Sequence, residues 1–111
     1  MTQDELLQLI DQPVSPIDKD AVMAQIQALK PKLVENYGLQ KIGIFGSVAR
    51  EEATISSDID VVVFMPPNML NRACLKADLE AVFGRKVDVI RYRQGMNPYL
   101  KARIDQEAIY A

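Results

Sequence analysis

Residues 45–64, FGSVAREEATISSDIDVVVF, contain the two elements that decide the fold. The apolar run Lys41–Phe45 leads directly into Gly46-Ser47, which favours a short buried strand followed by a turn or a short helix through Arg50. The β-branched run Asp58–Met65 then predicts a second strand. Because no long helix separates the two strands, this segment indicates a small mixed sheet rather than a doubly wound parallel fold.

The segments before this stretch predict helices. Residues 4–10 can form one short helix, and the proline-containing connector 11–17 follows it. Asp18 is placed to cap a second helix that ends near Gly38. Pro31 lies inside this helix, where we expect a kink or a split into two pieces. Apolar side chains recur at intervals of three and four and should face the core: Val22, Ile26, Leu29 and Leu33.

The segments after it predict a helix, a strand and a final helix. Asn68 can cap the first of these helices, which should end at Gly84 and bury Leu70, Ala73, Ala77 and Val82. Residues 86–92 form a third strand pattern. The last helix should begin at Asn97 or Pro98, with inward side chains Leu100, Ile104 and Ile109.

The pattern as a whole predicts an α/β (α+β) protein, with a small mixed β-sheet packed against helices. At 111 residues we expect one domain, 1–111, made of the N-terminal helix and connector 1–17 and a core 18–111. No apolar run approaches the length of a membrane span, and the acidic N-terminus does not resemble a signal peptide. We therefore expect a soluble cytoplasmic protein that does not contact membranes.

Composition excludes several chemistries. The chain has no histidine, which excludes Ser-His and Cys-His catalysis and histidine-ligated metals. It has one cysteine, Cys74, so neither an internal disulfide nor a cysteine-based zinc site can form. We expect Cys74 to be a small buried residue in a helix. Catalysis would have to use carboxylates, hydroxyls, lysine, arginine and a metal held by oxygen.

The charge balance argues against a general nucleic-acid binder, because the net charge is −2 and the estimated pI is about 5.1. Basic residues nevertheless become frequent toward the C-terminal end. They form either a solvated face balanced by nearby acidic residues such as Asp105 and Glu107, or a local patch for a phosphate or an acidic partner, and composition leaves both open. These basic residues are Arg85, Lys86, Arg91, Arg93, Lys101 and Arg103.

Asp58 and Asp60 are spaced to lie on one face of the second strand, opposite Ile59 and Val61. Two carboxylates on one face repel each other unless a cation lies between them. Mg²⁺ prefers such oxygen ligands and usually takes its remaining ligands from substrate phosphates. For this short motif alone, an exposed strand edge kept soluble by two aspartates is the better explanation.

Gly46-Ser47 is a candidate phosphate-binding turn. The missing Cβ of Gly46 lets an anion approach the backbone, and the Ser47 hydroxyl can donate to it. An ordinary turn with a capping serine would have the same sequence. Chain reversal between the two strands should place this turn beside Asp58 and Asp60.

Asp88 supplies a third carboxylate, in the middle of the third strand. If this strand pairs with the second one, Asp88 can face the aspartate pair and act as a metal ligand or as a base for an attacking hydroxyl. A salt bridge to Lys86 or Arg91 is the alternative. The residues themselves do not choose between the two.

The whole stretch resembles the signature of the DNA polymerase β-like nucleotidyltransferases. More narrowly, it resembles the minimal nucleotidyltransferases (MNT), in which G-S-x-A-R-G is followed by S-D-x-D. One departure is Glu51, which stands where the family usually has glycine and so resists a positive φ. The matching residues are Gly46, Ser47, Ala49, Arg50, Ser57, Asp58, Asp60 and Asp88.

The resemblance implies a polymerase β-like fold and a Mg²⁺-dependent transferase that uses ATP. Gly46, Ser47, Arg50 and Ser57 would bind the nucleotide, with Arg50 mainly bracing the turn. The catalytic and metal-binding carboxylates would be Asp58, Asp60 and Asp88. An acceptor hydroxyl would attack the α-phosphorus of ATP and release pyrophosphate.

The resemblance also implies the acceptor. MNT proteins are typically antitoxins of HEPN-domain ribonuclease toxins, which they silence by adenylylating a tyrosine. We therefore expect a HEPN-domain protein as acceptor and partner, with the N-terminal helix and segment 11–17 as candidate contacts and no direct binding of nucleic acid. Two alternatives stay open: a catalytically weak antitoxin that acts by binding alone, and a small nucleotide sensor without a toxin.

Overall fold

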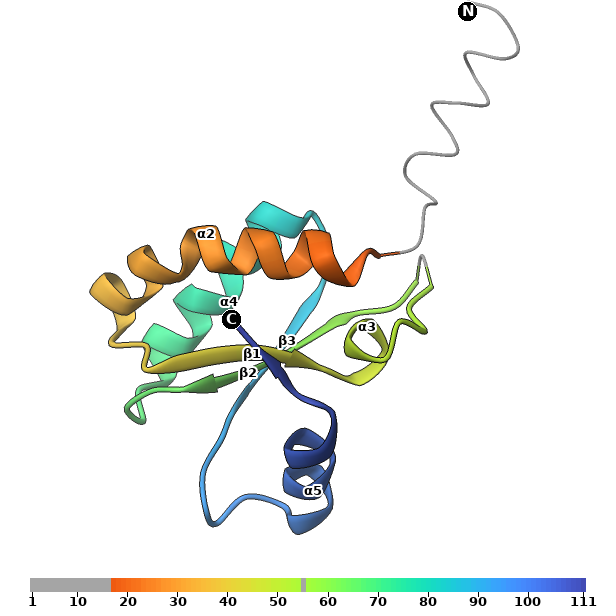
Figure 1. The fold of residues 1–111 in the computed structure, drawn as a ribbon. Helices are drawn as coiled ribbons and strands as arrows, with labels where there is room; N and C mark the ends of the chain where they lie inside the picture. The colour runs from red at the N-terminus through yellow and green to blue at the C-terminus, as the bar shows by residue number, and fades with distance from the viewer. Residues whose placement is uncertain (1–16, 55) are drawn as a thin grey trace, which may run out of the picture.

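The computed structural model describes residues 17–54 and 56–111, which form a four-stranded sheet between two layers of helices (Figure 1). The strands are β1 (Lys41–Phe45), β2 (Ile59–Phe64), β3 (Val87–Arg91) and β4 (Ile109–Tyr110). Their order is β3-β2-β1-β4, with β1 antiparallel to β2 and β4, and β3 parallel to β2. The predicted mixed α/β architecture is therefore confirmed.

The helices divide unequally between the two faces of the sheet. Helices α2 (Lys19–Tyr37) and α4 (Met69–Phe83) cover one face, and α5 (Pro98–Glu107) covers the other (Figure 1). The short helix α3 (Gly46–Ala49) lies between β1 and β2 at the end of the sheet. No helix within the described ranges is both long and apolar enough to cross a membrane.

Alternation along β2 divides the core in two. Ile59, Val61 and Val63 are fully buried beneath α2 and α4, whereas Val62 packs on the other face with Ile104 of α5. Asp60 therefore lies on the α5 face, where one helix leaves part of the sheet open. This division positions the site, because the α5 face is the less completely covered one.

The predicted helix ends are confirmed by their capping contacts. Asp18 and Asn68 cap α2 and α4 through their side chains, and Asn97 accepts from the backbone N–H groups of residues 99 and 100 at the start of α5. Gly38 and Gly84 end their helices with φ values of 69° and 62°, in the left-handed region. The helix predicted for residues 4–10, and the connector up to residue 16, lie outside the described residues.

The predicted split of α2 at Pro31 is wrong, because one helix runs from Lys19 to Tyr37. A proline within a helix removes one backbone hydrogen bond. The core holds both parts of α2, since Ile26 before the proline and Leu33 after it are fully buried. Packing of the apolar face therefore outweighs the local defect.

The predicted inward face of α4 is also wrong. Leu75 and Leu79 are the buried residues, while Leu70 is 72% exposed and Val82 is 41% exposed. The predicted residues recur with the helical period, but they lie on an exposed face. Leu75 and Leu79, one turn apart, form the face that is buried. Cys74 is exposed as well, contrary to the expectation that it is buried.

The chain end forms a strand rather than more helix. Ile109 was expected on the inward face of the last helix, but it lies in β4 and pairs with Ile44 of β1. Gly43 makes this pairing possible, because a Cβ at that position would approach the Ile109 carbonyl oxygen to 2.6 Å. Two residues are too short to give a strand pattern in the sequence.

Candidate functional site

Pairing of β2 with β3 brings two of the predicted carboxylates together. Asp60 is in register with Asp88 across the parallel pair, and it is also opposite Phe45 of β1. Neighbours in register project to the same face, so both carboxylates lie on the α5 face of the sheet. Asp58 precedes β2, and its carboxylate lies 3.8 Å from Lys86 Nζ. Within the described residues, no ion pair joins Asp88 to Lys86 or Arg91, the two partners of the alternative.

Asp60 lies in an environment that disfavours its charge. Burial is the main cause that raises the pKa of Asp60, and the negative charges of Asp88 and Asp58 raise it further. Arg103 and Arg50 lower it in part. A cation placed among the aspartates would relieve this repulsion, so the electrostatics of the site favour a bound positive ion.

Gly46 lies directly against Asp60 at the end of β1. Its φ is 74°, and a Cβ on this residue would overlap the Asp60 carboxylate. The sequence therefore needs glycine here for two reasons, the backbone conformation and the space for the carboxylate. The predicted proximity of the turn to Asp60 is confirmed, and Ser47 follows as the second residue of α3.

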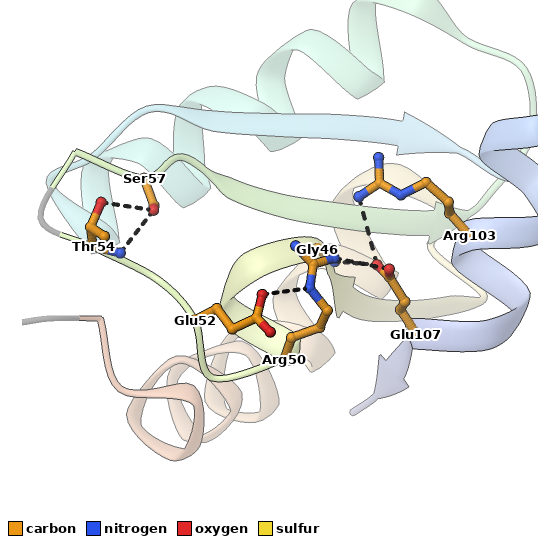
Figure 2. A network of polar contacts seen from close by, with 7 residues as sticks. All are labelled: Gly46, Arg50, Glu52, Thr54, Ser57, Arg103 and Glu107. Carbon is orange, nitrogen blue, oxygen red and sulfur yellow. Dashed lines mark hydrogen bonds and ion pairs between the residues drawn. The ribbon is translucent and has the colours of Figure 1, made fainter.

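The turn is held by a carboxylate that sequence reasoning missed. Glu107, the last residue of α5, accepts a hydrogen bond from the Gly46 N–H at 3.1 Å and another from Arg50 Nη1 at 2.9 Å (Figure 2). Arg103 Nη2 lies 3.7 Å from the same carboxylate. Glu107 was considered in the sequence only as a countercharge. Its separation of 61 residues from Gly46 gives no local pattern that could have revealed the contact.

Arg50 braces the turn, as the resemblance implied, through two glutamates. Its side chain bonds to Glu52 at 3.1 Å and to Glu107, both drawn in Figure 2. Glu51 has a φ of 61°, so the left-handed conformation expected of a glycine is kept by a glutamate. Lys19 Nζ lies 3.3 Å from its carboxylate.

Ser57 is used within its own loop. Its Oγ accepts from the Thr54 N–H at 2.9 Å and lies 3.2 Å from the Thr54 hydroxyl (Figure 2). The side chain closes this loop before Asp58. A contact of Ser57 with a nucleotide stays a prediction.

A cavity of about 700 Å³ opens beside the two aspartates. Its lining includes Asp60 and Asp88, and it follows β3 between α4 and α5. Gly46 and Ser47 are not part of the lining. Five basic residues share it, and we call this cavity the basic groove: Arg72, Lys76, Arg91, Arg93 and Arg103.

The carboxylates could supply one or two of the ligands of a Mg²⁺ ion, but not a complete set. Within residues 17–54 and 56–111, no three acidic or cysteine side chains lie close enough together to hold a metal ion by themselves. Mg²⁺ usually binds through one or two carboxylates and takes waters and phosphate oxygens for the rest. Asp60 and Asp88 in register, with no Cβ on Gly46 to crowd the first of them, match that requirement.

A mixed sheet that carries paired aspartates beside a glycine-serine turn defines an enzyme of the nucleotidyl-transfer class, and the comparisons with known proteins agree. Residues 26–111 match the model of the nucleotidyltransferase domain family. The chain therefore belongs to this family, and it is a nucleotidyltransferase.

Individual relatives support the same placement. A Methanocaldococcus jannaschii protein named as a protein adenylyltransferase is 40% identical over 83 residues, 73% of this chain and 85% of the relative. The protein adenylyltransferase MntA of Thermococcus cleftensis is 32% identical over 87 residues, 77% of this chain and 87% of the relative.

Two solved structures resemble the fold. A minimal nucleotidyltransferase superposes with a TM-score of 0.70 at 32% identity, covering 84% of this chain and 95% of that one. The Shewanella oneidensis complex of an MNT antitoxin with a tri-AMPylated HEPN toxin gives 0.60 at 19% identity, covering 83% and 70%. At that identity the second likeness concerns the fold alone.

Proposed function

We propose that this chain is a Mg²⁺-dependent protein adenylyltransferase that moves AMP from ATP to a tyrosine of a HEPN-domain toxin and so acts as its antitoxin. The observation that carries the proposal is the register of Asp60 with Asp88, next to a glycine whose backbone makes room for the first carboxylate. Relatives that share 32% to 43% identity are named protein adenylyltransferases. A structural neighbour contains an AMPylated HEPN toxin.

The reaction follows from these residues. The tyrosyl oxygen attacks the α-phosphorus of ATP in line with the leaving group. The new O–P bond forms while the bond from the α-phosphorus to the bridging oxygen breaks, and pyrophosphate leaves. Asp88 would accept the tyrosyl proton, since it lies beside Asp60 and lines the groove. Asp60 and Asp88, together with Asp58, would hold Mg²⁺, which would neutralise phosphate charge.

Intact mass spectrometry tests the proposal. The candidate HEPN-domain protein is incubated with this chain, ATP and Mg²⁺. We expect one or more added AMP masses, which disappear with Asp60→Asn and with Asp88→Asn. Asp20→Asn is the matched control, because Asp20 is exposed in the first turn of α2 and should leave the transfer unchanged.

A second candidate is an antitoxin that binds its partner without efficient catalysis. It is favoured by the acidic surroundings of the turn, where Glu51, Glu52 and Glu107 add negative charge near the phosphate position and Glu107 already occupies the Gly46 N–H. A stable complex without any added mass, formed equally by Asp60→Asn, would establish this candidate and overturn the transferase.

A further inference from the structure

The basic groove carries more positive charge than its two aspartates can neutralise. Five cationic side chains line it, against two carboxylates, in a chain whose net charge is −2. Arg91 donates to the Met65 carbonyl oxygen at 2.7 Å, and Arg103 lies near Glu107. Among the described residues, no ion pair joins Arg72, Lys76 or Arg93 to a carboxylate. Unneutralised cations gathered in a hollow favour an anionic ligand.

These three cations come from two walls of the groove. Arg72 and Lys76 lie one turn apart on α4, on the same side as Met69, which also lines the groove. Arg93 follows the end of β3, beyond Arg91. Because β3 runs from Asp88 toward Arg91, the groove leads away from the catalytic carboxylates along the edge strand of the sheet.

Apolar side chains at the rim point to a protein as the ligand. Met69 is 80% exposed and Leu70 is 72% exposed at the start of α4, and Tyr99 is 77% exposed beside the lining residues Asn97 and Leu100. Methionine, tyrosine and arginine are enriched in protein interfaces. A polynucleotide would be attracted by the same cations but would be repelled by the acidic remainder of the chain.

We infer that the basic groove is the docking track for the acceptor protein, and that the acceptor presents an acidic segment next to its reactive hydroxyl. Acidic side chains of the acceptor meet Arg72, Lys76 and Arg93, while apolar ones meet Met69 and Tyr99. The hydroxyl then lies at the Asp88 end. The nucleotide phosphates reach the carboxylates from the Gly46 turn, which is not part of the groove lining, so nucleotide and acceptor meet at Asp60 and Asp88. This inference rests on the proposed function for the identity of the reaction.

A random copolymer of glutamate and tyrosine serves as the probe, because it combines acidic side chains with the reactive hydroxyl. Its binding to the full chain is followed by fluorescence anisotropy. We expect binding that weakens with salt, and a loss of about tenfold or more in the variant with Arg72→Glu, Lys76→Glu and Arg93→Glu together. Lys32→Glu, an exposed lysine of α2, is the charge control and should change the affinity by less than about twofold.

Further measurements separate this inference from the proposed function. The variant should keep wild-type affinity for a non-hydrolysable ATP analogue; a parallel loss would mean that the groove binds nucleotide and would overturn the inference. So would tighter binding of poly(U) than of the copolymer, or no binding of the copolymer at all. Copolymer binding through the groove without AMP transfer, to it or to the HEPN-domain protein, would keep the docking track and reject the transferase. Thermal unfolding, with a variant in which glutamine replaces the same three residues, checks that the fold is intact.

Discussion

Two neighbouring regions of this molecule differ in whether their charged groups have partners within the described part of the chain. In the α3 turn, residues 46–52, the charged groups are satisfied within the chain: Arg50 by Glu52 and Glu107, and the Gly46 N–H by Glu107. In the basic groove, Arg72, Lys76 and Arg93 have no such partner within the described residues. The turn uses its charged groups to fix its own conformation beside Asp60. The cations of the groove stay available to a ligand.

The difference makes a direct prediction. Substitutions in the turn should change stability and the placement of Asp60, and substitutions in the groove should change binding alone. Arg103 connects the two regions, because it lines the groove and lies 3.7 Å from Glu107.

The largest effect is expected at Gly46. In Gly46→Ala the new Cβ would overlap the Asp60 carboxylate, and the φ of 74° would strain any other residue. If Asp60 acts in the transfer as proposed, its displacement should lower AMP transfer by about a hundredfold or more. Gly84→Ala is the matched control, because Gly84 also has a positive φ, 62°, but a Cβ added there has no atom within 4 Å. It should lower stability by about 1 kcal/mol without affecting transfer. Equal loss of transfer in both variants would mean that backbone strain, and not displacement of Asp60, is the reason that position 46 needs glycine.

Glu107 tests whether the turn is scaffold. Glu107→Ala leaves the buried Gly46 N–H without an acceptor, so the free energy of unfolding should fall by about 1–3 kcal/mol. Denaturant unfolding measures it, with Glu52→Ala as the control. The Glu52 side chain is 66% exposed, and its loss should cost about 0.5 kcal/mol or less. If Glu107→Ala is as stable as wild type and binds nucleotide more tightly, Glu107 competes with phosphate instead of bracing the turn.

Glu51 should respond in the opposite direction. Glu51→Gly relieves a left-handed conformation at φ 61° and should raise stability by about 0.5–1 kcal/mol, since the strain relieved exceeds the entropy of the added glycine. Glu51→Ala removes the contact with Lys19 but keeps a Cβ, and should bring no gain. Thermal unfolding of both variants measures the change. A gain in stability in the alanine variant as well would mean that the charge of Glu51, and not its backbone conformation, causes the effect.

A hydrogen bond between α2 and α4, outside the turn and the groove lining, gives the reference for a small effect. The Tyr37 hydroxyl donates to Asp78 at 2.5 Å, and this hydrogen bond is the main cause that raises the Tyr37 pKa to about 12. Tyr37→Phe should lower stability at pH 7 by about 0.5 kcal/mol, because the bond is exposed. The folded pKa is raised, so this contribution is present below the unfolded pKa of about 10 and is lost as pH rises toward 12. A difference between the two proteins that persists unchanged above pH 12 would contradict this sign.

The smallest effect on stability is expected in the groove. Changing Arg72, Lys76 and Arg93 to glutamine should alter the free energy of unfolding by about 0.5 kcal/mol or less in total, because no ion pair is broken within the described residues. Denaturant unfolding of this variant beside Glu107→Ala compares the two regions directly. A loss as large as that of Glu107→Ala would remove the distinction between scaffold and binding surface.

The parts of the fold that sequence predicted are those fixed by local chemistry. Capping residues such as Asp18 and Asn68, the glycine helix ends and the β-branched run of β2 act within a few residues of where they lie. The inward face of α4 was not predictable in this way, since it depends on which leucines meet the sheet. β4 was missed because its two residues are held by Gly43 from far along the chain.

The candidate site divides in the same manner. The meeting of Asp60 with Asp88 could be predicted from strand periodicity and the assumption of neighbouring strands, and the register confirms it. Glu107 and the α4 side of the groove could not, because both depend on how α5 and α4 pack beside the sheet. The assignment of Asp58, Asp60 and Asp88 to metal and of Ser47 and Ser57 to nucleotide stays a prediction.

The most direct test of the central claim is the metal-dependent binding of a non-hydrolysable ATP analogue, measured by calorimetry without any acceptor. If Asp60 and Asp88 hold a metal–nucleotide complex beside Gly46, affinity with Mg²⁺ should exceed that with EDTA by about tenfold or more, and Asp60→Asn should abolish the difference. Asp20→Asn should keep it. Equal affinity with and without Mg²⁺, or a difference that survives Asp60→Asn, would contradict the assignment of this site.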